Sequence, residues 1–136
     1  MFTLDPIQIK NCYKVANFLE TLSEDDLRME DFVTRGSRMR PPTCGSVCCV
    51  LGWTPAIIDC EDMKGPDGYY NYDQIGASIF GVRPNFPAVY KELFGVLLPD
   101  DPKEVAQRLR MWAKSGGNTA EFFSMIDEEF CVQCNW

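Results

Sequence analysis

The residues of this chain best suited to chemistry are cysteines, and they gather in two segments. The first is Cys-Gly-Ser-Val-Cys-Cys-Val-Leu-Gly-Trp (residues 44–53), and the second is Cys-Val-Gln-Cys (residues 131–134). Four thiolates make a common tetrahedral zinc site, and the second segment has the spacing of a zinc knuckle. The ligands of this zinc site would be Cys44, Cys48, Cys131 and Cys134.

Two other interpretations of the same cysteines compete with zinc. In the packing interpretation, Ser46 or Thr43 caps a helix, Gly45 permits the bend before it, and the thiols fill the core. In the redox interpretation, residues 131–134 form a dithiol, but they lack the Trp-Cys-Gly-Pro context and the βαβ surroundings of thioredoxin-like enzymes. We favour packing over zinc, and zinc over redox chemistry.

Catalysis by other residue types is restricted because the chain contains no histidine. Ser-His-Asp and Cys-His sites, imidazole-bound zinc and imidazole acid–base chemistry are thereby excluded. No Walker motif and no calcium loop is present. Cysteine and carboxylate chemistry stay open as an alternative, but we predict that the chain is not an enzyme and has no cofactor unless zinc binds.

The chain has 20 acidic and 13 basic residues, which give a net charge of −7. Such a surface repels a phosphate backbone, so we expect no direct nucleic-acid binding. The same charge suits a protein partner with a basic, nucleic-acid-binding groove. The residues predicted to contact the partner form two acidic clusters: Glu24, Asp25, Asp26, Glu30 and Asp31, and then Asp127, Glu128 and Glu129.

Apolar periodicity and capping signals predict a mainly α fold with five to seven short helices. We expect helices over residues 7–22, 45–53, 73–80, 86–94 and 102–115, a short acidic turn from residue 23, and a last helix from residue 119. Asp101, Asn118, Gly81 and Gly116 are the clearest capping residues. Residues 34–43 read as a loop with three arginines, and one small β-hairpin is expected near residues 62–72.

Length and composition suggest a single compact domain, residues 1–136. With 46% hydrophobic residues, a chain of this size can bury a core without disulfides or metal. No apolar run reaches the ~20 residues of a membrane helix, and the N-terminus lacks a secretory signal. We therefore expect a cytoplasmic protein with reduced thiols and no membrane partner.

The first cysteine segment resembles a loose group of small, mostly unassigned phage and bacterial proteins that carry Cys-Gly-Thr-x-x-Cys-x-x-Gly-Trp or -His. The matching residues are Cys44, Gly45, Cys49, Gly52 and Trp53; Ser46 replaces the threonine, and Cys48 is additional. Weaker likeness at residues 79–82 and 93–94 extends the resemblance to about residues 12–113. It implies a helical fold and a phage or bacterial source, carries no activity, and does not favour Cys48 as a ligand.

Together these observations predict a small acidic phage-type interaction protein that binds and modulates a protein partner. Inhibition of a host defence nuclease, through its basic groove, would suit the charge. The alternatives are a zinc-stabilised binding module and a Cys- or carboxylate-dependent enzyme.

Overall fold

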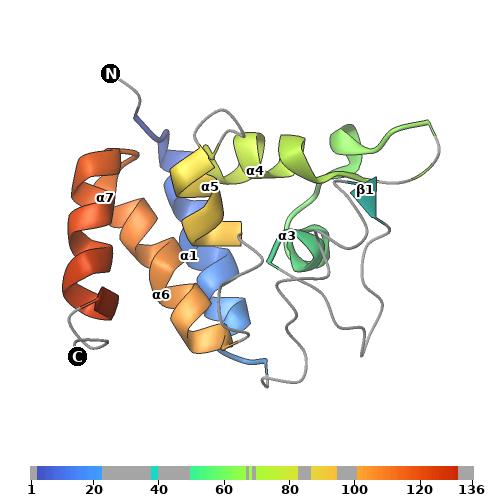
Figure 1. Cartoon of the computed structure of the whole chain (residues 1–136). Coiled ribbons are helices and arrows are strands. Elements are labelled where there is room, and N and C mark those ends of the chain that lie inside the picture. Colours follow the sequence, from blue (N-terminus) through green and yellow to red (C-terminus); the bar gives the residue numbers. More distant parts are fainter. Residues whose placement is uncertain are drawn as a thin grey trace.

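A computed structural model of the chain describes residues 3–22, 38–39, 50–66, 68, 70–82, 87–94 and 101–131. The fold is mainly helical, as predicted. Figure 1 shows α6 (Pro102–Ser115) between α7 (Thr119–Ile126) and α1 (Pro6–Leu19), and α4 (Tyr72–Phe80) extends from the upper end of α1 on the side away from α7. The acidic turn expected from residue 23 lies outside the described residues.

Helix α1 begins with a capping box that the sequence patterns did not single out. The Asp5 side chain accepts a hydrogen bond from the Gln8 backbone at 2.8 Å, and the Gln8 side chain accepts one from the Asp5 backbone at 3.1 Å. The helix ends at Leu19 rather than at Leu22. After Leu19 the backbone bonds shorten to i+3 spacing, and the Thr21 hydroxyl donates to the Phe18 carbonyl at 2.6 Å, which tightens the last turn.

The middle of the chain is built from short elements. Of the helix expected over residues 45–53, the described part is α3 (Val50–Trp53), followed by the 3₁₀ turns η2 (Thr54–Ala56) and η3 (Glu61–Met63). Pro55 fits the start of η2, where its missing N–H is not needed. Thr54 is fully buried, and its hydroxyl donates to the Val50 carbonyl at 2.8 Å instead of capping the new turn.

A small antiparallel β-structure lies beside these turns. Strand β2 (Tyr70–Asn71) forms a bridge with Lys64, which closes the hairpin expected near residues 62–72. The same strand also pairs with β1 (Arg38–Met39), in the register Arg38 to Asn71 and Met39 to Tyr70. Strand β1 lies in residues 34–43, which were predicted to be a loop, so the prediction is wrong for these two residues. The pairing joins segments more than 30 residues apart, and local sequence patterns do not encode such contacts.

The C-terminal carbonyl groups of α4 are the point where three helices meet. Gly81 ends the helix with φ +71°, as its sequence position predicts. Side-chain donors from α1 and α6 bind the last three carbonyls: Gln8 to Ser78 at 3.4 Å, Asn11 to Ile79 at 3.1 Å, and Trp112 to Phe80 at 2.7 Å. These bonds satisfy groups that a helix end otherwise leaves without partners and fix α4 against its neighbours.

Helix α5 (Pro87–Phe94) packs on α4 through a glycine. A Cβ at Gly76 would lie 3.3 Å from the Val82 carbonyl oxygen and 3.5 Å from the Phe94 ring, so glycine permits the close approach. The Tyr90 hydroxyl donates to the Asp73 carboxylate at 2.9 Å, and the Phe80 and Phe94 rings lie 5.5 Å apart. One continuous core results, with side chains from α1, α3, α4, α5, α6 and α7.

Candidate protein-binding surface

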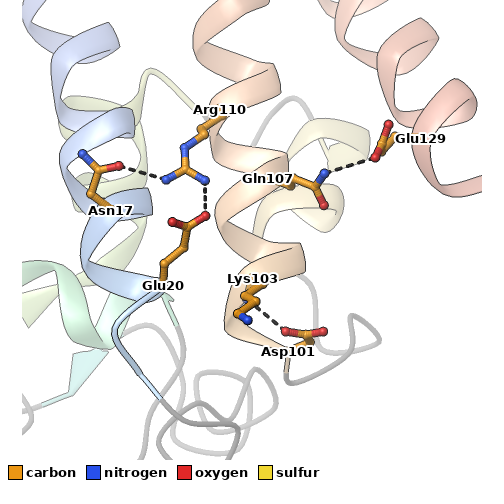
Figure 2. Close-up of polar contacts among 7 residues, drawn as sticks. All are labelled: Asn17, Glu20, Asp101, Lys103, Gln107, Arg110 and Glu129. Carbon is orange, nitrogen blue, oxygen red and sulfur yellow. Dashed lines mark hydrogen bonds and ion pairs between the residues drawn. The ribbon is translucent and has the colours of Figure 1, made fainter.

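Three of the residues predicted to contact a partner are described by the structure, and they lie on one turn at the end of α7. We call Asp127, Glu128 and Glu129 the acidic end. They occupy the π-helical turn η4 (Asp127–Cys131), which continues α7 without a break. Asp127 and Glu128 are exposed, whereas Glu129 is half-buried and accepts a hydrogen bond from Gln107 of α6 at 3.1 Å (Figure 2).

Packing of α7 on α6 positions the acidic end. Asn118 caps α7 by accepting a hydrogen bond from the Glu121 backbone at 3.0 Å, as predicted from the sequence. Phe122 is fully buried and meets the Trp112 ring edge to face at 5.3 Å. Because this face of α7 is buried, Asp127 and Glu128 lie on the exposed side of the turn.

The other predicted contact cluster, residues 24–31, lies outside the described residues. Both acidic clusters remain predicted contact sites.

The predicted zinc ligands are likewise mostly outside the described part of the chain. Cys44, Cys48 and Cys134 fall there, and of Cys131 only the backbone position in η4 is described. Among the described ranges, no three cysteine or carboxylate side chains come together in a way that could hold a metal ion. Zinc binding by the four cysteines stays a prediction.

Two thiols outside the two cysteine segments are core residues. Cys12 is fully buried on α1, and burial raises its pKa to about 12. Burial, with a smaller effect of the Asp59 charge, raises the pKa of Cys60 to about 11. Both side chains are protonated at neutral pH and fill space, which is the packing use that we favoured for cysteine in this chain.

A second charged surface, of opposite sign, lies on α1 and α6. Lys10 and Lys14 are exposed on α1, and Lys103 and Lys114 are exposed on α6. Between the two helices the Arg110 guanidinium donates to the Asn17 side chain at 2.9 Å and forms an ion pair with Glu20 (Figure 2). The hydrogen bond from Arg110, with the positive charges of Arg110 and Lys103, holds the pKa of Glu20 below its ordinary value.

The sequence alone predicts only part of this basic surface. The spacing of Lys10, Lys14 and Asn17 places all three on one face of a helix. This face of α1 adjoins the basic face of α6 because the two helices pack against each other in the fold.

None of the helices within the described ranges is both long and apolar enough to cross a membrane. Comparison of the chain with protein-family models, with curated proteins and with solved structures finds no match. The resemblance to the phage and bacterial group stays a prediction.

Proposed function

We propose that this chain is a small acidic interaction protein that acts by binding and modulating a protein partner rather than by catalysis. The observation that carries the proposal is the acidic end, where Asp127 and Glu128 stand exposed on a turn anchored to the core by Phe122. No lysine or arginine follows Lys114, so the last 22 residues carry four carboxylate side chains and no cationic ones.

A partner with a basic surface fits this end by charge. Opposite charges on two surfaces accelerate encounter and orient the complex, and the net charge of −7 adds to the attraction at long range. Within this proposal, the partner carries a groove of the kind that binds nucleic acid, a host defence nuclease being the specific candidate. A phage source belongs to the same proposal.

The buried thiols support binding over cysteine chemistry in the described part of the chain. A nucleophilic cysteine needs thiolate character and access, whereas the pKa of Cys12 and that of Cys60 are raised and both residues are buried.

The test is a pulldown with the tagged chain from its native host, repeated with charge-reversed variants. We expect D127K/E128K to lose the captured protein, since it replaces two exposed carboxylates by cations. The matched control is E61K/D62K, an adjacent exposed pair on η3 with the same change in charge, which should capture the partner as the wild type does.

Titration calorimetry with the captured protein then gives the affinities. We expect at least a tenfold loss for D127K/E128K and less than a threefold loss for the control. A further variant also reverses the carboxylates of residues 24–31. If this variant still binds with wild-type affinity, the acidic clusters are not the contact sites and the proposal is wrong.

A further inference from the structure

Helices α1 and α6 differ in charge from the rest of this acidic protein. Their segments contain six basic residues and one acidic residue, so together they carry +5 in a chain whose net charge is −7. Of the six bases, Arg108 is buried and pairs with Glu92 of α5 at 3.5 Å. The other five lie toward solvent and determine the charge of the outer side of the helix pair.

The four exposed lysines form one face, which we call the lysine face: Lys10, Lys14, Lys103 and Lys114. On α1, Lys10 and Lys14 are one turn apart and in line with Asn17. On α6, Lys103 and Lys114 are about three turns apart and in line with Arg110. The hydrogen bond from Arg110 to Asn17 joins the two rows, and the bond from the Leu4 amide to the Gly116 carbonyl at 2.8 Å sets the helices antiparallel.

The lysines of this face keep their charge available for a partner. Glu20, the carboxylate between the two rows, is bound by Arg110. Within the described residues, none of the four lysines forms an ion pair of its own. Positive charges on one face repel one another, and an anionic partner would relieve that repulsion.

An exposed apolar side chain borders the same face. Ile7 is 70% exposed, and no other large hydrophobic residue in the described ranges is exposed. It lies three residues before Lys10 and seven before Lys14, so the three side chains share one side of α1. The face thus offers a hydrophobic contact beside cationic groups.

We propose that the lysine face, with Ile7, binds an acidic polypeptide segment that carries an apolar side chain. Carboxylates would meet the lysines, and the apolar side chain would cover Ile7. This interaction is separate from the one proposed for the acidic end, since it lies on other residues and selects a partner of opposite charge.

Charge and donor geometry favour a polypeptide over a nucleic acid. Arginine is the residue best shaped to bind a phosphate group, because its guanidinium can donate two parallel hydrogen bonds. The guanidinium of Arg110 already donates to Asn17 and Glu20. The net charge of −7 repels a continuous polyanion at long range. The exposed Ile7 side chain can pack against a leucine of a polypeptide, whereas a charged phosphate backbone offers it no apolar contact.

The experiment measures fluorescence anisotropy of a labelled peptide, Glu-Glu-Leu-Glu-Glu-Leu-Glu-Glu, with the full chain at low salt. We expect binding that weakens at least tenfold in K10Q/K14Q/K103Q/K114Q and at least threefold in K10Q/K14Q. The matched control K64Q/K91Q removes the same two charges elsewhere and should change the affinity less than twofold. The variant I7S should weaken binding of this peptide at least threefold, and binding of an all-glutamate peptide less than twofold.

Unchanged circular dichroism spectra and melting temperatures establish that the variants fold, which is expected because the substituted side chains lie outside the core. If K10Q/K14Q and K64Q/K91Q weaken peptide binding equally, the peptide is attracted by positive charge at any place on the surface, and the proposal is overturned. Tighter binding of an eight-nucleotide oligothymidylate than of the peptide, or no peptide binding at all, would also overturn it. None of these outcomes bears on the acidic end.

Discussion

Cys12 and Cys60 show how the surroundings of a residue determine its chemistry. Both thiols lie in the apolar core, and burial is the largest cause of the raised pKa of each. Burial therefore makes them poor nucleophiles, although the same residue type at an exposed helix N-terminus is reactive. Cysteine in this part of the chain contributes packing.

The reactivity of Cys12 can be measured directly. We expect N-ethylmaleimide at pH 8 to leave Cys12 unmodified in the folded chain, because the side chain is fully buried and its pKa is about 12. Peptide mass mapping after brief exposure gives the modified fraction at each cysteine, and the urea-unfolded chain is the control. Modification of Cys12 at the same rate in both states would contradict its burial.

The same thiol predicts a loss of stability at high pH. An unfolded cysteine ionises near pH 9, whereas folded Cys12 stays protonated to about pH 12. Stability is therefore fully present below pH 9 and falls as the pH rises toward 12, by about 1.4 kcal/mol for each pH unit. Urea unfolding of the wild type and of Cys12→Ala between pH 8 and 11 should show a shallower pH dependence in the variant.

At the scale of the element, capping residues determine where the helices begin and end. Asp101 accepts a hydrogen bond from the Lys103 backbone at 3.0 Å, and Pro102 occupies the first turn of α6, both as predicted. Gly116 ends α6 with φ +63°, where a side chain would be strained. The next residue but one, Asn118, then starts α7, so these two residues define the corner between the helices.

The cap of α7 should contribute to the stability of the fold. We expect Asn118→Ala to lower the free energy of unfolding by about 1 kcal/mol, because the Glu121 N–H loses its partner. Ser124→Ala, at an exposed position inside α7, is the matched control and should change it by less than about 0.5 kcal/mol. Urea denaturation measures both, and equal effects would show that the cap contributes nothing specific.

At the scale of the whole molecule, one core joins the described elements, and charge is distributed unevenly over its surface. The buried side chains form a single cluster that includes residues from both ends of the described chain, among them Leu4 and Ile126. Around this core, α6 packs between α1 and α7, so the helix with four basic residues lies next to the helix whose end is acidic. The two proposed binding surfaces therefore differ in charge.

A shared core predicts cooperative unfolding. We expect tryptophan fluorescence, which reports Trp53 and Trp112 among others, and far-ultraviolet circular dichroism to give the same urea midpoint. The two residues lie in different parts of the fold, and a separately folding unit would unfold at its own midpoint. Midpoints that differ beyond error would contradict a single domain.

The helical class and most helix boundaries in the described ranges could be predicted from the sequence, because caps and apolar periodicity act over three or four residues. Asp101, Asn118, Gly81 and Gly116 illustrate this. The pairing of β1 with β2, the bond from Trp112 to the Phe80 carbonyl and the bond from Arg110 of α6 to Asn17 of α1 could be known only from the folded structure. These contacts join residues far apart in the chain, and they form because burying the shared core brings the segments together.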